Sequence, residues 1–120
     1  MKVVAIIQAR TGSTRLPEKV LMDLRGAPVL ARVIQRTQRA QSLDGLVVAT
    51  STLGRDDTIV DIASNMGVEV FRGSETDVLS RYVGAARQAG GNIVVRITAD
   101  CPLIDPDVID EAVHALTGGF

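Results

Sequence analysis

The sequence predicts one α/β domain with three layers, α/β/α, built around a mostly parallel sheet. Short apolar runs alternate along the chain with longer segments whose apolar residues recur at helical spacing. Four runs and four such segments alternate over residues 1–120, with no repeat or linker between them. The 120 residues are 46% apolar, which is enough for one packed core and not for two. This alternation favours right-handed crossovers, and we expect the strand order 3-2-1-4.

The first third of the chain contains two expected strands, a polar loop and a helix. Residues 3–7 are a continuous β-branched run, which is typical of a strand buried on both faces. A polar loop follows over residues 9–19, and residues 45–49 form a second buried run. Between them, residues 28–40 predict a helix with arginines outward and an apolar face made of Leu30, Val33, Ile34 and Thr37.

The middle third predicts a helix over residues 56–66 and a short strand over residues 68–71. We expect Asp56 and Asp57 to cap and charge the start of this helix. Gly67 stands where a left-handed helix end favours glycine. The expected buried face of the helix consists of Ile59, Ile62, Ala63 and Met66.

The last third predicts a helix over residues 76–89, a strand over residues 93–97 and a final helix. The first of these helices ends at two glycines, and its expected buried face consists of Val78, Leu79, Tyr82, Val83 and Ala86. The final helix opens with Asp105 as N-cap and Pro106 in the first turn. Its expected buried residues are Val108, Ile109, Ala112, Val113 and Leu116.

Charge and composition exclude several classes of protein. The 13 basic residues nearly balance the 14 acidic ones, and a net charge of −1 argues against a general nucleic-acid binder. No apolar run is long enough to span a bilayer, and the amino terminus lacks the pattern of a secretory signal. The one cysteine, Cys101, excludes an internal disulfide framework and fits a reducing compartment. We therefore expect a cytoplasmic protein with neither a nucleic-acid nor a membrane partner.

Polar residues follow all four expected strands, at residues 8–10, 50–52, 72–74 and 98–100. Ligands of open α/β sheets bind at the carboxyl ends of the strands, so these segments predict one binding site. The first loop carries Arg10, Arg15 and Lys19, which suit phosphate oxygens, and Gly12 allows close backbone approach. The Walker and dinucleotide glycine patterns are both absent. The alternative interpretation of this loop is a solvated surface segment.

Four segments together resemble the cytidylyltransferases that activate acidic sugars, and most closely the spore-coat polysaccharide branch of that family. They are residues 7–19, 47–51, 71–82 and 96–105, which match in order and spacing. The resemblance implies a Rossmann-like fold of the nucleotide-diphospho-sugar transferase (GT-A-like) type. It also implies that a sugar hydroxyl attacks the α-phosphate of CTP, with Mg²⁺ assisting, to give a CMP-sugar and pyrophosphate.

The same resemblance implies a role for individual residues. Arg15 and Lys19 would be catalytic, and Asp100 would bind Mg²⁺. The implied nucleotide-binding residues are Ala9, Arg10, Gly12, Ser13, Arg15, Lys19, Thr50, Ser51, Arg72 and Asp77. Three of these assignments have a structural alternative: Arg72 as a solvated arginine, Asp77 as a helix cap and Asp100 as a turn residue.

Members of this family are about twice as long, so the resemblance implies that residues 1–120 form the nucleotide-binding domain of an amino-terminal half. The other half would supply the sugar pocket and a homodimer interface. Thr98 stands where the octulosonate enzymes often carry glutamine, which favours a different sugar. Two other functions stay open: a sugar-1-phosphate nucleotidyltransferase that uses another nucleotide, and a nucleotide-binding module without catalysis.

Overall fold

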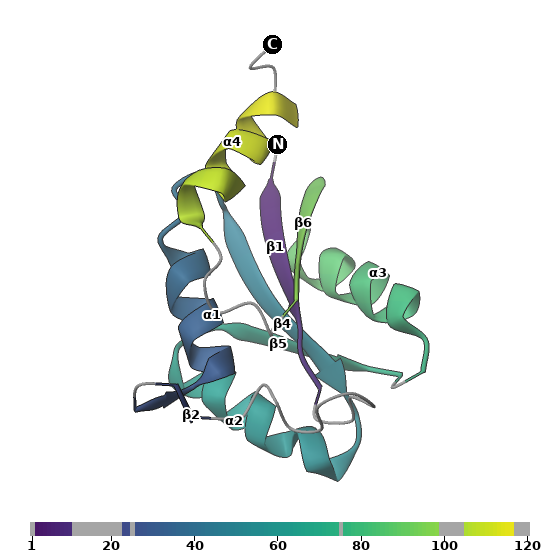
Figure 1. Ribbon diagram of the computed structural model, residues 1–120. Coiled ribbons are helices and arrows are strands. Elements are labelled where there is room, and N and C mark those ends of the chain that lie inside the picture. The colour runs from purple at the N-terminus through teal and green to yellow at the C-terminus, as the bar shows by residue number, and fades with distance from the viewer. Residues whose placement is uncertain (1, 11–22, 25, 75, 99–104, 117–120) are drawn as a thin grey trace.

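A four-stranded parallel sheet forms the centre of the computed structural model, which describes residues 2–10, 23, 24, 26–74, 76–98 and 105–116 (Figure 1). The strands lie in the order β5-β4-β1-β6, and every neighbouring pair is parallel. Their bounds are β1 (Val3–Gln8), β4 (Gly45–Ser51), β5 (Glu69–Gly73) and β6 (Ile93–Thr98). This confirms the predicted order 3-2-1-4.

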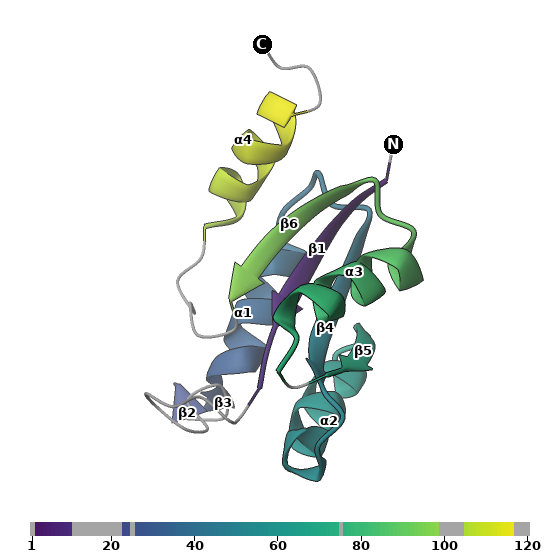
Figure 2. The same ribbon diagram turned by 90° about the vertical axis from the view of Figure 1, so that its right-hand side faces the viewer.

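Helices cover both faces of the sheet, as the alternating pattern predicts. Three of them lie on one face: α1 (Val29–Gln38), α2 (Asp57–Asn65) and α4 (Pro106–Leu116). The fourth, α3 (Val78–Ala89), lies alone on the other face (Figures 1 and 2). No helix in the described part of the chain is long and apolar enough to cross a membrane.

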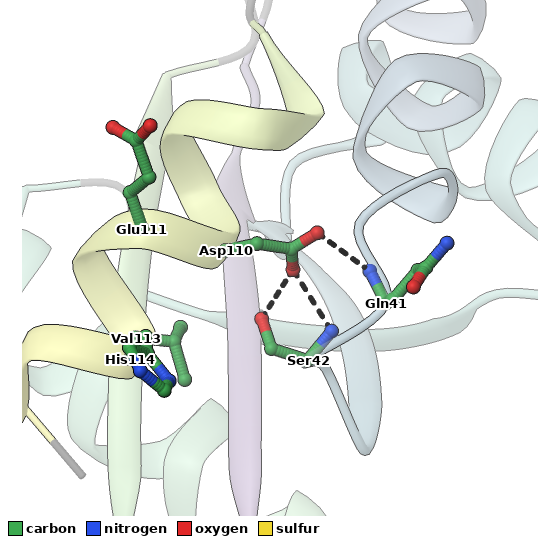
Figure 3. A pocket seen from close by; sticks show the side chains of 6 residues that line it. All are labelled: Gln41, Ser42, Asp110, Glu111, Val113 and His114. Carbon is green, nitrogen blue, oxygen red and sulfur yellow. Dashed lines mark hydrogen bonds between the residues drawn. The ribbon is translucent and has the colours of Figure 1, made fainter. Parts of the chain in front are cut away.

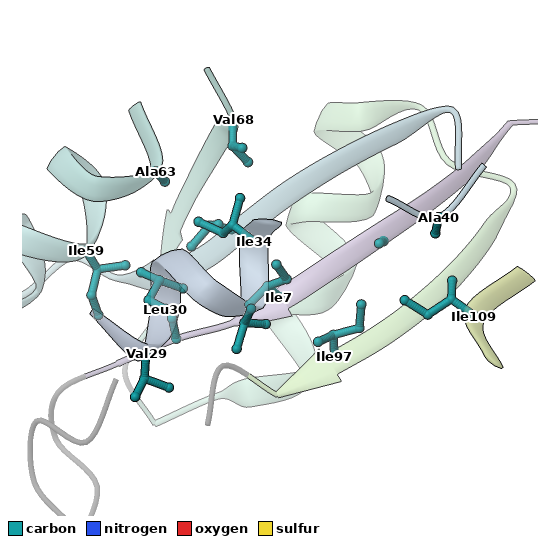
Figure 4. Close-up of a cluster of buried hydrophobic side chains, with 14 of the residues drawn as sticks. Ile7, Val29, Leu30, Ile34, Ala40, Ile59, Ala63, Val68, Ile97 and Ile109 are labelled. Atoms are coloured by element: carbon teal, nitrogen blue, oxygen red, sulfur yellow. The ribbon is translucent and has the colours of Figure 1, made fainter. Parts of the chain in front are cut away.

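The larger core lies between the sheet and the three-helix layer (Figure 4). The helical face predicted for α1 is confirmed, because Leu30, Val33, Ile34 and Thr37 are all fully buried. On α2, Ile59 and Ala63 are fully buried, while Ile62 and Met66 pack against the edge of this core. The central strand β1 contributes to both cores, since Ala5 and Ile7 face α1 and Val4 and Ile6 face α3.

Helix ends follow the capping residues of the sequence. Gly67 after α2 has φ +74° and Gly90 after α3 has φ +69°, values that favour glycine. Asp105 caps α4, because its Oδ1 accepts a hydrogen bond from the backbone N–H of Asp107 at 2.9 Å. Asp77 caps α3 in the same way, accepting from Ser80 N–H at 3.0 Å.

A small antiparallel hairpin precedes α1 and was not expected from the sequence. Its strands are β2 (Asp23–Leu24) and β3 (Ala27–Pro28), and Gly26 between them has φ +89°. Because Pro28 belongs to β3, α1 begins one residue later than the apolar periodicity suggests.

The buried face of α3 differs from the predicted one. Leu79 is 72% exposed, and Val78 and Val83 are also exposed, whereas Arg81, Ala85 and Ala89 are buried beside Tyr82. Small residues face the sheet because the helix approaches it closely: a Cβ added at Gly84 would lie 2.2 Å from Cζ of Phe71 in β5. The prediction is confirmed for Tyr82 and Ala86 and wrong for Val78, Leu79 and Val83, because it assigned every large aliphatic residue of the helix to the core.

The outer elements are less buried than their apolar sequences suggest. Ile109 and Val113 of α4 are buried as expected, but Val108 and Ala112 are exposed. In β6, which has one strand neighbour among the described residues, only Ile97 is buried. The guanidinium of Arg96 lies 4.5 Å from the ring centre of Tyr82, so a cation–π contact joins β6 to α3.

Candidate functional site

The carboxyl ends of the strands meet at one edge of the sheet, which brings the predicted segments together. In register, Gln8 of β1 pairs with Ala49 of β4 and with Thr98 of β6. Ser51 at the end of β4 pairs with Gly73 at the end of β5. The polar residues that follow these strands therefore start from neighbouring positions, as the parallel topology requires.

Ala9 and Arg10 continue β1 at this edge. Ala9 is buried in the larger core, and its backbone N–H donates to the carbonyl of Ala49 at 3.0 Å. Arg10 is half-buried. The start of the predicted phosphate loop is thus fixed by the sheet itself.

Thr50 and Ser51 end β4 with both side chains buried. The Thr50 hydroxyl has no hydrogen-bond partner in the described part of the chain although the residue is fully buried. Ser51 instead donates its hydroxyl to the carboxylate of Asp56, which is also fully buried. The expectation that the Asp56 side chain caps α2 is therefore wrong, because that side chain bonds Ser51 and makes no capping hydrogen bond to the helix.

Arg72 of β5 holds the segment that follows β4. Its Nε donates to the carbonyl of Ser51, and a second nitrogen donates to the carbonyl of Leu53, both at 2.8 Å. The third nitrogen forms an ion pair with Asp57 at 2.8 Å. The alternative of a purely solvated arginine is therefore wrong. A direct contact with a nucleotide stays a prediction.

Arg81 is the residue of this edge that the sequence analysis missed. It is 2% exposed and is the largest fully buried side chain among the described residues. Its Nε donates to Oε1 of Gln8 at 3.1 Å, and another nitrogen donates to the carbonyl of Ser74 at 2.8 Å. Its position four residues before Ala85 and eight before Ala89, on a stripe of small residues, was the available signal.

The electrostatics of the edge are set by charges of both signs. Burial, together with the nearby charge of Arg10, lowers the pKa of Arg81, while the carboxylates of Asp56 and Asp77 act in the opposite direction. Both cations thus contribute positive charge to the region where β1 ends. Positive charge at this edge favours an anionic ligand.

Several predicted residues lie outside the described residues. They are Gly12, Ser13, Arg15 and Lys19 of the first loop, and Asp100 after β6. No group of three or more metal-binding side chains occurs in the described ranges. The chemistry expected of Asp100 still fits Mg²⁺, which takes one or two carboxylates together with substrate phosphates and water.

A shallow pocket of about 500 Å³ lies at the opposite edge of the sheet, between α4 and the segment that leads into β4 (Figure 3). Asp110 of α4 occupies its wall and accepts hydrogen bonds from Gln41 N–H at 3.1 Å and from both Ser42 N–H, at 2.9 Å, and the Ser42 hydroxyl. The pKa of Asp110 is lowered, mainly by the Ser42 hydroxyl. This carboxylate fastens α4 to the domain.

Curated relatives carry the same pattern over nearly the whole chain. A 3-deoxy-manno-octulosonate cytidylyltransferase from Anaeromyxobacter dehalogenans is 40% identical, across 98% of this chain and 48% of that protein. The spore coat polysaccharide biosynthesis protein SpsF from Bacillus subtilis is 38% identical, across 94% of this chain and 49% of its own length. The chain therefore spans about half the length of these relatives.

Solved structures share the fold. A cytidylyltransferase from Leptospira borgpetersenii superposes with a TM-score of 0.93 at 40% identity, over 98% of this chain and 50% of that one. A CMP:2-keto-3-deoxy-manno-octonic acid synthetase complexed with CTP gives a TM-score of 0.86 at 24% identity, over 98% and 48%. The latter shows the fold alone.

The family assignment rests on the sequence pattern as a whole. The pattern that defines the family described as cytidylyltransferase matches residues 4–119, which run from the second residue of β1 through α4. The chain belongs to the cytidylyltransferase family.

Proposed function

We propose that this chain is the CTP-binding half of a sugar cytidylyltransferase. A hydroxyl of an acidic or related sugar attacks the α-phosphorus of CTP. The bond between the α-phosphorus and the oxygen that links it to the β-phosphorus breaks. The products are a CMP-sugar, for polysaccharide biosynthesis, and pyrophosphate. The observation that carries the proposal is the edge where β1, β4 and β5 end, at which the half-buried Arg10 follows β1 and the buried Arg81 bonds Gln8, in a chain of this family.

Each predicted residue has a place in this proposal. Arg10, Ser13, Arg15 and Lys19, with backbone groups of Ala9 and Gly12, bind the triphosphate and neutralise the leaving pyrophosphate. Thr50, Ser51, Arg72 and Asp77 form the side of the site for cytosine and ribose. The buried hydroxyl of Thr50 supports this, because a buried polar atom that lacks a partner in the described chain needs a reason to be there.

Magnesium is part of the proposal. Asp100 would hold it together with phosphate oxygens of CTP, two residues after Thr98, which pairs with Gln8 beside the start of the phosphate loop. When bound, the ion supplies positive charge to the phosphates. The arginines and the lysine orient the α-phosphate toward the sugar hydroxyl, so that positioning and charge neutralisation carry most of the catalysis.

The proposed cellular compartment and partners rest on composition and resemblance. The one cysteine fits the cytoplasm, and the near-balanced charge fits a protein without a nucleic-acid partner. The longer proteins of this family lead us to propose a homodimer for a chain that includes the other half.

Calorimetric titration of the chain with CTP, UTP, GTP and ATP, each with and without Mg²⁺, tests the proposal. We expect CTP to bind at least tenfold more tightly than the other nucleotides, and more tightly with Mg²⁺ than without. Preference for another nucleotide would favour the sugar-1-phosphate enzymes. Absence of binding to all four would contradict the proposal.

Transfer itself is tested by pyrophosphate release from CTP with acidic sugars, in a chain that includes the other half of the relatives. The matched variants are Arg15→Lys, which keeps the charge but loses the bidentate fork, and Arg39→Lys on the exposed surface of the domain. We expect turnover to fall with the first and to stay unchanged with the second. Absence of sugar-dependent pyrophosphate release from CTP in the unaltered protein would exclude the assigned reaction.

A further inference from the structure

Burial of the charged Arg81 side chain costs free energy, so its buried position requires a structural explanation. Transfer of a guanidinium group from water into a protein interior costs on the order of several kcal/mol unless its N–H donors are hydrogen-bonded. An apolar residue would pack against the sheet at no such cost. Two of its acceptors, Gln8 Oε1 and the Ser74 carbonyl, belong to two different strand-end segments. The side chain therefore joins segments that are far apart in the sequence.

Gln8 is held at both ends of its amide. Oε1 accepts from Arg81, and Nε2 donates to the carbonyl of Val78, the first residue of α3, at 3.4 Å. Gln8 is the last residue of β1, and Ala9 and Arg10 follow it directly. A fixed Gln8 therefore fixes the point from which the predicted phosphate loop departs.

Ser74 is held in the segment that starts α3. Its carbonyl accepts from Arg81, and its hydroxyl accepts from the backbone N–H of Asp77 at 3.2 Å. Asp77 in turn caps α3. The same guanidinium thus orders the second segment of the edge.

The strand beside Arg81 is shaped to let its stem pass. A Cβ added at Gly73 would lie 3.1 Å from Cγ of Arg81 and 3.0 Å from Cε1 of Phe71, which is tighter than ordinary contact. The glycine therefore gives the arginine room to reach the edge of the sheet while its helix packs against β4 and β5.

We propose that Arg81 is a positioning residue of the nucleotide site, which acts by holding residues 8–10, Ser74 and Asp77 in one arrangement. It acts through Gln8 and Ser74 and makes no contact with the nucleotide. Arginine is required because its planar fork reaches two acceptors in fixed directions, whereas an ammonium group presents a point charge. The identity of the nucleotide in this inference rests on the proposed function. The hydrogen bonds by which Arg81 joins the two segments do not depend on it.

The first measurement is amide hydrogen exchange on the chain without ligand, for the unaltered protein, Arg81→Lys and Arg87→Lys. Arg87 lies on the same helix and is exposed, so its variant is the matched control. We expect Arg81→Lys to speed exchange in residues 8–10, 74, 76 and 77 and to leave α1 and α2 unchanged. Uniformly faster exchange would overturn the proposal, because it would show loss of global stability only.

The second measurement is CTP affinity. We expect Arg81→Lys to weaken binding by roughly tenfold and Arg87→Lys to leave it unchanged. Gly73→Ala, which crowds the stem and keeps the charge, should weaken binding in the same direction. If Arg81 acts through Gln8, Arg81→Lys should weaken binding much less in a Gln8→Ala background. Full additivity of the two changes would contradict the proposed route.

The two proposals fail in different ways. If the unaltered chain binds no nucleotide while exchange changes only in the two segments, the proposed function is wrong and the positioning role stands. If CTP binds and Arg81→Lys changes neither affinity nor local exchange, the function stands and the positioning role is wrong.

Discussion

Two buried threonines differ in one hydrogen bond, and that difference predicts opposite effects of the same substitution. Thr50 and Thr37 are both fully buried. The Thr37 hydroxyl donates to the carbonyl of Val33 at 2.8 Å, whereas the Thr50 hydroxyl has no partner among the described residues. A buried polar group without a partner costs about 1–3 kcal/mol, while a satisfied hydrogen bond contributes about 1 kcal/mol.

We therefore expect Thr50→Val to raise the free energy of unfolding by about 1 kcal/mol and Thr37→Val to lower it by a similar amount. Urea denaturation measures both. If the Thr50 hydroxyl also serves the nucleotide, Thr50→Val weakens CTP binding while it stabilises the fold, a combination that Thr37→Val does not produce. A destabilised Thr50→Val would show that the hydroxyl is satisfied in the folded chain.

Gly84 is required by a close contact and not by backbone conformation. A Cβ there would meet three ring atoms of Phe71 at 2.2–2.8 Å. Alanine gains about 1 kcal/mol of helix propensity, but the ring must move and overpacking costs more. We expect Gly84→Ala to lower the free energy of unfolding by about 2 kcal/mol, measured in urea. Gly54→Ala is the control, because its Cβ meets nothing within 4 Å. An equal change in the free energy of unfolding for both variants would contradict the close contact between Gly84 and the Phe71 ring.

At the scale of elements, one carboxylate of α4 accepts hydrogen bonds from the segment between α1 and β4, in addition to the apolar packing of Ile109 and Val113. Asp110 accepts from two backbone N–H groups and one hydroxyl there. We expect Asp110→Asn to lower the thermal midpoint at pH 7 and to speed amide exchange in α4, because an amide oxygen is a weaker acceptor than a carboxylate. Glu111→Gln removes a neighbouring charge from the same pocket wall and serves as the control.

The pH dependence of this attachment has a definite sign. These hydrogen bonds lower the pKa of Asp110 below its ordinary value of 3.8. The carboxylate therefore stabilises the folded chain at pH values above 3.8, and the contribution is lost as pH falls through the lowered pKa. The difference in midpoint between the unaltered chain and Asp110→Asn should shrink across that interval. A difference that persists well below it would assign the effect to packing.

The elements were largely predictable because their burial is periodic. Alternation gave the strand order, and glycines and capping residues placed the ends of α2, α3 and α4. The face of α3 was not predictable from hydrophobicity, since close approach to Phe71 favours Gly84 and Ala85 over Leu79. The β2–β3 hairpin escaped notice because strands of two residues show no periodicity.

For the candidate site, the meeting of the strand-end segments was predictable from the sequence, and the hydrogen bonds of the individual side chains were not. Parallel topology brings Ala9, Arg10, Thr50 and Ser51 to one edge whatever the side chains do. The bond from Ser51 to Asp56 and the contacts of Arg72 depend on the path of the intervening turn, which the residue types alone do not specify. Arg81 was missed because a cation on a helix is expected to face water.

At the scale of the whole molecule, a chain with a net charge of −1 is proposed to bind the polyanion CTP. Positive charge near the site must therefore attract CTP more strongly than the net charge of the chain repels it. Ligand that binds only the folded state stabilises it by about 2.7 kcal/mol at 100 times its Kd. For a domain of this size we expect CTP with Mg²⁺ to raise the thermal midpoint by on the order of 10 °C. The rise in thermal midpoint should shrink with added salt, because phosphate contacts are screened.

At low salt, Arg10→Ala should also shrink this rise in thermal midpoint. Arg39→Ala, which also removes one positive charge, should leave it unchanged. Equal losses in the two variants would show that CTP responds to net charge, and the site at the carboxyl edge would then be the wrong place for it.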